Sequence, residues 1–243
     1  MGDAFAGVTA LFAAIAGGLL VVVASLQHAQ LLEARAALQQ QQFEGLFFRL
    51  LDLLHDLTER FHFVGDRQRD PPGEDRDGSA ALDAFAGRIM DKWGKGEGTD
   101  AELRRLVALF LSNAHGTAPS HFDPYFRMLY EVFKHIAESS LTDRQKIQYA
   151  NIARGQIGDG TVLLLALNGL TEDGYNFVKF IEGFGLLEHL PADCRHAWPA
   201  LKHGYRERAR KGPAEGKLGR LAEPKYAPEK SKFAEAATQE AAY

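Results

Sequence analysis

The sequence has one cysteine and no clustered metal ligands. Cys194 alone cannot form an internal disulfide, which is typical of a protein kept in a reducing compartment. The nine histidines are scattered, with no H-x-x-x-H or C-x-x-C spacing that would hold a zinc ion. The sequence therefore predicts no metal site, and nothing in it calls for a cofactor.

An excess of positive charge is also missing. The chain has 28 Lys and Arg against 32 Asp and Glu, a formal net charge of −4 and a pI near 6.1. Nucleic-acid-binding proteins are usually more basic, so nucleic acid is not favoured as a partner. No useful length of sequence alternates apolar and polar residues as a strand does. With 46% hydrophobic residues the chain can bury a core, and we expect an all-α fold.

Charge is absent altogether from Ala4 to Leu26. This run, AFAGVTALFAAIAGGLLVVVASL, contains 23 residues, and about 20 suffice for a helix to cross the hydrocarbon core of a bilayer. A soluble protein would have to bury such a helix on all sides. A cleaved signal peptide would carry a basic region first, and only Asp3 precedes this run. We therefore predict a transmembrane helix at 4–26, with the lipid bilayer as a partner.

The basic residues near this helix indicate its orientation. Arg35 is the nearest basic residue after the run, and no Lys or Arg precedes it. Because Lys and Arg gather on the cytoplasmic side of membrane proteins, the remainder of the chain is expected in the cytoplasm. The interpretation is a single-pass protein of the inner (cytoplasmic) membrane, and the lone thiol agrees with it.

Small residues recur every four positions within the predicted span, at Ala6, Ala10, Ala14 and Gly18. Such ridges let two helices approach closely in lipid. We therefore hypothesise a homo-oligomer formed through this face. The alternative is that alanine is simply common in this chain.

The predicted helix does not stop at the membrane. Residues 27–57 contain no proline and a single glycine, Gly45. Their apolar residues fit one face of a long, partly coiled-coil-like helix, so residues 27–60 are interpreted as a stalk. The apolar positions are Leu31, Leu38, Phe43, Phe47, Leu50, Leu54 and Leu57. Residues 65–79 are polar and rich in Pro and Gly, and are expected to form a loop.

A helical bundle is predicted over residues 80–200. Thr99 with Glu102, and Thr142 with Gln145, have the spacing of capping boxes that begin helices. The apolar run VLLLAL is interpreted as a core helix because its flanks are helical. The expected helices cover 80–93, 101–115, 125–140, 143–157, 161–170 and 172–184, followed by a short helical turn at 186–198.

From residue 203 the composition changes to that of a tail. Residues 202–220 contain seven Lys and Arg against two Glu, and large apolar residues become rare up to Tyr243. We expect residues 203–243 to be disordered. Such a tail could contact anionic lipid or nucleic acid through charge, or simply be solvated.

Four stretches together carry a resemblance: GDAFAG at 2–7, FEGLFFRLLDL at 43–53, YFRMLY at 125–130, and YANIARGQ at 149–156 with Asn168 downstream. In this order they resemble the putative phage abortive infection protein family. The resemblance implies a bacterial antiviral defence protein with an N-terminal membrane region and a Gln-rich stalk, and a phage-derived trigger. It brings no established enzymatic activity. The residues that match its motifs are Phe43, Glu44, Phe47, Phe48, Tyr125, Phe126, Arg127, Tyr130, Tyr149, Arg154, Gln156 and Asn168.

The sequence departs from the family pattern at two places. Family members often carry another hydrophobic segment upstream of the GD-x-x-x-G region, where this sequence starts. The sequence RGQIGDG also differs from the Ser- and Glu-bearing sequence expected after Arg-x-Gln, so no role for those polar groups is carried over.

Arg127 is the most informative polar residue, because it lies among aromatic residues at helical spacing. An arginine there must be paired if it is buried. One interpretation is a structural ion pair with Glu44 or Asp52, and the other is a contact to an anion or phosphate. The same two interpretations apply to Arg154 and Gln156. Asn168 is expected to cap a helix or to make a hydrogen bond inside the bundle.

Three functions remain open from the sequence. The leading one is a membrane-anchored defence protein whose helical domain senses infection and acts without an evident catalytic site. The second is a membrane-tethered ribonuclease-type toxin with Arg127 and His135 as candidate catalytic residues. These residues lie eight positions apart, two turns along one helix, which is too far to bind one phosphate together. The third is a membrane-tethered scaffold.

Overall fold

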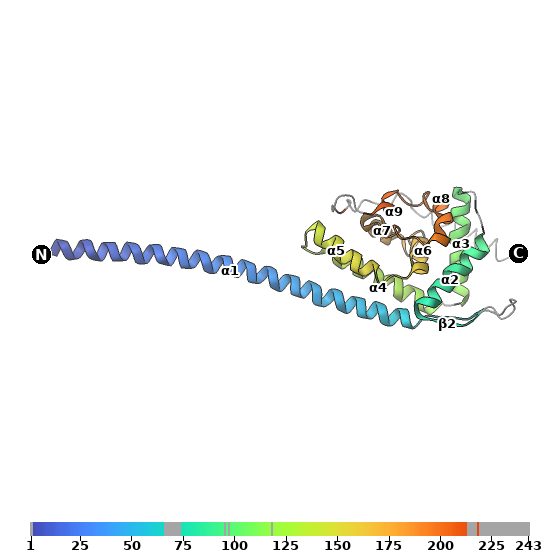
Figure 1. Ribbon diagram of the computed structural model, residues 1–243, viewed down its shortest axis with the longest axis horizontal. Coiled ribbons are helices and arrows are strands. Elements are labelled where there is room, and N and C mark those ends of the chain that lie inside the picture. The colour runs from blue at the N-terminus through green and yellow to red at the C-terminus, as the bar shows by residue number, and fades with distance from the viewer. Residues whose placement is uncertain are drawn as a thin grey trace. The chain divides into compact units, whose positions relative to one another are not determined.

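The computed structural model describes residues 2–65, 74–94, 96, 98–117, 119–212 and 218, except for the side chains of residues 2–16, 114–121 and 193. The fold is all-α, as predicted (Figure 1). Its helices are α1 (Gly2–Glu59), α2 (Gly78–Trp93), α3 (Asp100–Thr117), α4 (Pro119–Glu138), α5 (Asp143–Arg154), α6 (Asp159–Asn168), α7 (Val178–Phe184), α8 (Trp198–Leu201) and α9 (Arg208–Lys211), with 3-10 helices η1 (Tyr175–Phe177) and η2 (Ala192–Ala197).

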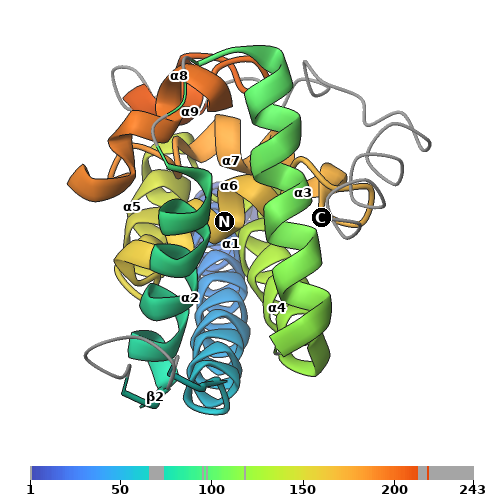
Figure 2. The same ribbon diagram turned by 90° about the vertical axis from the view of Figure 1, so that its right-hand side faces the viewer.

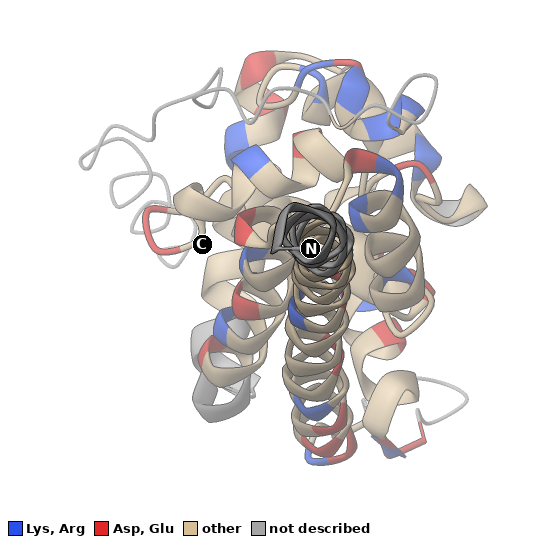
Figure 3. Cartoon of the chain, turned by 90° about the vertical axis from the view of Figure 1, so that its left-hand side faces the viewer, with Lys and Arg blue, Asp and Glu red and all other residues tan. Residues whose placement is uncertain are grey.

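The chain divides into two units, residues 1–46 and 47–243. In the first unit, helix α1 continues without a break from the apolar run into the Gln-rich stretch, as the sequence predicts. From Gly17 to Gln42 every residue is exposed, including Leu20 at 70% and Val21 at 67%. After Asp3 the next charged residue of α1 is Glu33, and Figure 3 shows the charged residues toward its C-terminal turns.

One stretch of the described residues, Gly17–Glu59, is long and apolar enough for a membrane span. Its most apolar 18-residue window has a mean hydropathy of 1.2, and none of that window is buried. By length and composition this stretch is a candidate membrane span. A core helix of a soluble protein would be mostly buried, and this stretch is not.

The core of the second unit is built around α6. Every residue of this helix from Gly160 to Leu167 is buried, which confirms the core helix predicted from VLLLAL. The helix lies between α2 and α3 (Figure 2) and packs against both. Gly160 allows the close approach to α2, because a Cβ there would lie 2.6 Å from the Cα of Asp83. The backbone N–H of Gly160 also donates to the Asp83 carboxylate at 2.7 Å.

The capping boxes begin their helices as predicted. At α5, the backbone N–H of Gln145 donates to the Thr142 hydroxyl, and the Gln145 side chain accepts from the Thr142 backbone. At α3, Glu102 and Thr99 make the equivalent pair of hydrogen bonds, each 3.3 Å long.

Several element bounds differ from the prediction. Helix α4 starts at Pro119, six residues early, because proline is favoured at a helix start, and Pro124 lies inside it. Helix α7 is shorter than predicted, since Thr171 closes a turn instead of capping a helix. A two-stranded antiparallel ladder, β1 (His62–Phe63) with β2 (Arg76–Asp77), was not predicted. Strands of two residues are too short to show alternation in the sequence. Residues 66–73 of the predicted loop lie outside the described residues.

The start of the predicted tail is folded. Residues 203–212 include helix α9, and the Tyr205 hydroxyl donates to the carbonyl of Ala166 in α6 at 2.7 Å. Burial raises the pKa of Tyr205 well above its ordinary value, and the negative charge of Glu182 adds to this. The remaining tail, apart from Leu218, lies outside the described residues.

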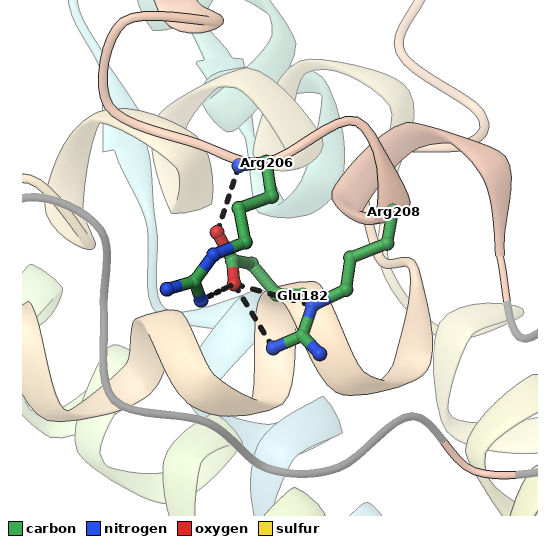
Figure 4. Close-up of polar contacts among 3 residues, drawn as sticks. All are labelled: Glu182, Arg206 and Arg208. Atoms are coloured by element: carbon green, nitrogen blue, oxygen red, sulfur yellow. Dashed lines mark hydrogen bonds and ion pairs between the residues drawn. The ribbon is translucent and has the colours of Figure 1, made fainter.

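Glu182 holds this segment in place (Figure 4). Its side chain is completely buried in α7 and accepts from the backbone N–H and the guanidinium of Arg206, both at 2.8 Å. The guanidinium of Arg208 reaches the same carboxylate at 3.0 Å. Two of the basic residues assigned to a solvated tail are therefore the counter-ions of a buried acid.

Candidate functional site

The motif residues around the end of α1 and in α5 meet in the second unit. Phe47 is fully buried and packs edge to face on Tyr149, with ring centroids 5.1 Å apart. Phe48 is half exposed, and its ring lies 5.3 Å from that of Phe47. In the first unit, Phe43 is buried and Glu44 accepts a hydrogen bond from Gln40 at 3.0 Å. These motif residues therefore serve packing and helix stability.

Tyr125 and Phe126 belong to an aromatic cluster. Tyr125 packs on Phe61 and Phe126, and Phe126 stacks on Phe122 at 6.0 Å. Burial raises the pKa of Tyr125 to about 12. The phenol is thus neutral at physiological pH and acts as a core residue.

Arg154 makes the structural ion pair that was one of its two interpretations. Its guanidinium lies 2.9 Å from the Glu188 carboxylate, and only 11% of its side chain is exposed. A longer hydrogen bond of 3.3 Å joins it to Asn151. Gln156 is exposed. The YANIARGQ motif therefore positions α5 against the turn after α7 through Arg154.

Four motif residues, Phe126, Arg127, Tyr130 and Asn168, line one pocket of about 360 Å³. Asp123, Arg127 and Tyr130 follow one another at spacings of four and three along α4, so they share one face of that helix. We call this cavity the α4 pocket, and its lining comprises Asp123, Phe126, Arg127, Tyr130, Asn168, Asp173, Gly174, Asn176 and Phe177.

A tight turn between α6 and η1 forms the opposite wall. The Asn168 carbonyl ends α6 by accepting from the backbone N–H of Thr171 at 3.0 Å and from its hydroxyl at 2.7 Å. The backbone N–H of Gly174 then donates to that hydroxyl at 3.1 Å. A Cβ at position 174 would collide with the Asn168 carbonyl, so this close approach requires glycine. The turn thereby holds Asn168, Asp173 and Asn176 at one cavity.

The pocket has an aromatic floor and a charged rim. Phe126 and Phe177 are buried, and Tyr130 is half-buried with its ring 5.8 Å from that of Phe177. The rim residues Asp123, Arg127, Asp173 and Asn176 are exposed. Two carboxylates and one guanidinium make the lining net negative. Apolar walls with a few convergent polar groups are typical of ligand sites.

The side chain of Arg127 is exposed, so it is not a buried charge that needs a partner. It makes no ion pair with Glu44 or Asp52, nor with any other residue that the structure describes. The side chains of Asp123, Asp173 and Asn176 are likewise free of hydrogen bonds and ion pairs within the described part of the chain. The polar groups at the rim thus remain available to a ligand.

Arg127 also lines a second pocket, of about 400 Å³, which we call the α1–α4 pocket. It lies between the last turns of α1 and helix α4, and its lining comprises Leu53, Asp56, Leu57, Arg60, Pro124, Arg127, Met128 and Glu131. Arg127 therefore stands between the α4 pocket and the end of α1, with carboxylates on both sides.

His135 does not join Arg127 at a site. Both residues lie on α4, about 12 Å apart along its axis at 1.5 Å per residue. Neither of the two pockets described above is lined by His135. Among the described residues no group of three His, Cys, Asp or Glu is placed to hold a metal ion.

The sequence reasoning missed Asp123, Asp173, Gly174, Asn176 and Phe177. A signal existed for Asp123, which precedes Arg127 by one helical turn. The others follow Asn168 within nine positions, but only the fold brings that turn to α4. The predicted ridge of small residues comprises Ala6, Ala10, Ala14 and Gly18. The structure does not describe the side chains of the three alanines, and a Cβ at Gly18 would meet no other atom within 4 Å.

The α4 pocket lies entirely within one stretch of sequence that has relatives. Residues 117–195 match the model of the putative phage abortive infection protein family. The match runs from the end of α3 into η2, is to the same family that the motifs resemble, and includes YFRMLY and YANIARGQ. FEGLFFRLLDL and the apolar run precede the matched residues. No curated protein and no solved structure matches the chain.

Proposed function

We propose that this chain is a membrane-anchored antiphage defence protein of the abortive-infection type. Residues 4–26 anchor it, residues 27–60 link the anchor to the bundle, and the bundle senses a phage-derived trigger. The observation that carries this proposal is the family match over residues 117–195, because it contains every residue of the α4 pocket. A role in phage defence follows from the family, and sensing is assigned to the pocket because its rim is unpaired.

The exposure of α1 supports anchoring. Leu19, Leu20, Val21 and Val22 are each at least 59% exposed, although apolar surface left in water forgoes about 25 cal/mol per Å². A bilayer would cover these side chains without a protein partner. Arg35 after the apolar run and the reduced Cys194 support a cytoplasmic bundle at the inner membrane.

The α1–α4 pocket supports a route from sensor to anchor. Arg127 lines both pockets, so a ligand that draws this guanidinium toward the α4 pocket moves it away from the α1–α4 pocket, whose lining includes Asp56 and Glu131. The last turns of α1 belong to the same helix as the anchor. In this mechanism the trigger changes α1, self-association through the Ala6–Gly18 ridge follows, and the bilayer is disturbed.

The test is to measure membrane potential with a dye, alongside total RNA, in phage-infected cells carrying the gene. Depolarisation with intact RNA, together with protection from phage, is the expected result. Intact potential with fragmented RNA would favour the ribonuclease alternative and make Arg127 and His135 the residues to replace. Protection without either change would leave the membrane-tethered scaffold as the function.

A charge within the apolar run tests the anchor itself. Leu19→Arg places an arginine in the predicted span, where insertion costs about 3 kcal/mol near the helix centre. We expect this variant to leave the membrane fraction and to lose protection, whereas the matched Leu19→Met variant keeps both. Full protection by a soluble Leu19→Arg protein would contradict anchoring as part of the mechanism.

A further inference from the structure

The composition of the α4 pocket restricts the class of ligand it can take. Its lining carries Asp123 and Asp173 against a single Arg127, so a polyphosphate would meet net repulsion. Among the described residues no group of three His, Cys, Asp or Glu side chains is placed to hold a metal ion. A volume of about 360 Å³ is at the small end for ligand sites, and fits one or two side chains.

The floor and the rim of the α4 pocket would contact different kinds of ligand group. Phe126 and Phe177 are buried aromatic surfaces that an aromatic or large aliphatic group would cover. Asp123 and Asp173 are exposed, unpaired carboxylates that would meet cations at the mouth. The amides of Asn168 and Asn176 can both donate and accept, as a peptide main chain requires.

We propose that the α4 pocket binds a polypeptide segment in which an aromatic side chain is flanked by lysine or arginine, presented by a second protein. The aromatic side chain packs on Phe126 and Phe177, and the flanking cations pair with Asp123 and Asp173. Arg127 donates to main-chain carbonyls of the segment. This inference rests on the proposed function, since it gives the chemistry of the trigger.

The chain's own C-terminal sequence is the competing source of the same chemistry. Residues 225–233, KYAPEKSKF, place Tyr226 and Phe233 beside lysines. The family match, however, includes the whole pocket and ends at residue 195, well before this segment. A ligand for the matched part of the chain is therefore assigned to another protein.

The binding test uses the full-length protein in an uncharged detergent and fluorescein-labelled peptides read by anisotropy. The probe is acetyl-Lys-Lys-Phe-Lys-Lys-amide, compared with the same peptide carrying Ser for Phe and with one carrying Glu for every Lys. We expect the probe to bind at least about tenfold more tightly than either control peptide. Equal binding of the Ser peptide would overturn the proposal, because it would reduce the interaction to charge alone.

Variants locate the binding. The Asp123→Asn, Asp173→Asn double variant should weaken the probe about tenfold or more. The double variant Glu138→Gln, Glu207→Gln removes the same charge at exposed positions outside the pocket lining and should bind as wild type. Matching unfolding midpoints exclude a folding defect. Unchanged affinity in the pocket variant would overturn the proposal.

A further variant, Tyr226→Ser with Phe233→Ser, separates the two sources. Binding of the probe to wild type and to this variant alike supports a second protein as the donor. Binding to this variant alone would show that the chain's own segment occupies the pocket, and would overturn the assignment to a partner.

Phage-protection assays distinguish the proposed defence function from the proposed peptide binding by the α4 pocket. If wild type protects cells and the pocket variant protects equally despite losing the probe, the inference is wrong and the proposed function stands. If wild type confers no protection, the proposed function is wrong whatever the peptides do. Loss of both protection and probe binding in the pocket variant supports the inference.

Discussion

Glu182 is the one fully buried acid among the described residues, and it lies in the apolar helix α7. Arg206 and Arg208 supply its counter-charges, although 39% and 28% of their side chains stay exposed. A buried carboxylate is tolerated only when it is paired and hydrogen-bonded, so residues 203–212 are needed to complete this part of the bundle.

Glu182→Gln should therefore destabilise the protein. Because the two arginines are partly solvated, we expect the free energy of unfolding to fall by about 2 kcal/mol rather than the larger cost of stranding a buried charge. Urea unfolding followed by far-UV circular dichroism measures this. Glu207→Gln, which removes an exposed acid between the same arginines, is the matched control and should change little. An equal effect of the two substitutions would contradict the assigned role.

Tyr125 makes the free energy of unfolding fall at alkaline pH. Its pKa is about 12 in the fold against an ordinary value near 10, so between these values the unfolded chain loses a proton that the folded chain keeps. The stability contributed by the neutral phenol is present below about pH 10 and is lost as the pH rises toward 12. Tyr125→Phe should reduce the alkaline loss by about 2–3 kcal/mol. Unfolding free energies at neutral and alkaline pH test this, and parallel curves for the two proteins would argue against it.

At the scale of elements, the turn between α6 and η1 decides whether the α4 pocket exists. Gly174 is buried within it, and the Asn168 carbonyl leaves no room for a Cβ. The turn is closed by hydrogen bonds from Thr171, so the backbone cannot yield without breaking them.

Gly174→Ala should lower the free energy of unfolding by about 2–3 kcal/mol, as expected for overpacking against backbone. Gly87→Ala is the matched control, because Gly87 is exposed inside α2 with nothing near its Cα. That substitution should stabilise by about 0.5–1 kcal/mol through helix propensity. Thermal unfolding of both variants gives the comparison, and a neutral Gly174→Ala would mean that the turn relaxes freely.

At the scale of the whole molecule, the chain combines an apolar helix with a bundle whose pocket lies in the family-matched segment. The proposed mechanism needs both the anchor and the α4 pocket. One arrangement uses the anchor and the pocket of the same chain, and the other combines the anchor of one chain with the pocket of another. Self-association through the small-residue ridge would allow the second arrangement.

Co-expression of two inactive variants distinguishes these arrangements. Leu19→Arg lacks the anchor, and Asp123→Asn with Asp173→Asn lacks the pocket. If the signal passes along α1 within one chain, the pair should give no protection, measured as phage plaque counts. Restored protection would show that sensing and anchoring are shared between chains. Each variant expressed alone, at matched protein level, is the control.

The sequence by itself indicated the all-α fold and the candidate span. The apolar run VLLLAL and its helical flanks located the core helix, and the spacing of Thr142 with Gln145 gave the start of α5. Both depend on residues within a few positions. The uncharged run from Ala4 to Leu26 is a property of composition alone. The motifs carried the resemblance to the family and named four residues of the α4 pocket, Phe126, Arg127, Tyr130 and Asn168.

Only the tertiary structure decided which of these residues act together. It placed Arg127 at an exposed rim rather than in the core, and it joined α4 to the turn at Asp173 and Asn176, more than forty positions away. It also gave Glu182 its arginine partners at Arg206 and Arg208, from a segment whose composition predicts a tail. Pairings of this kind depend on the packing of distant segments, and that packing minimises buried charge and empty volume over the whole bundle. Local sequence carries no record of it.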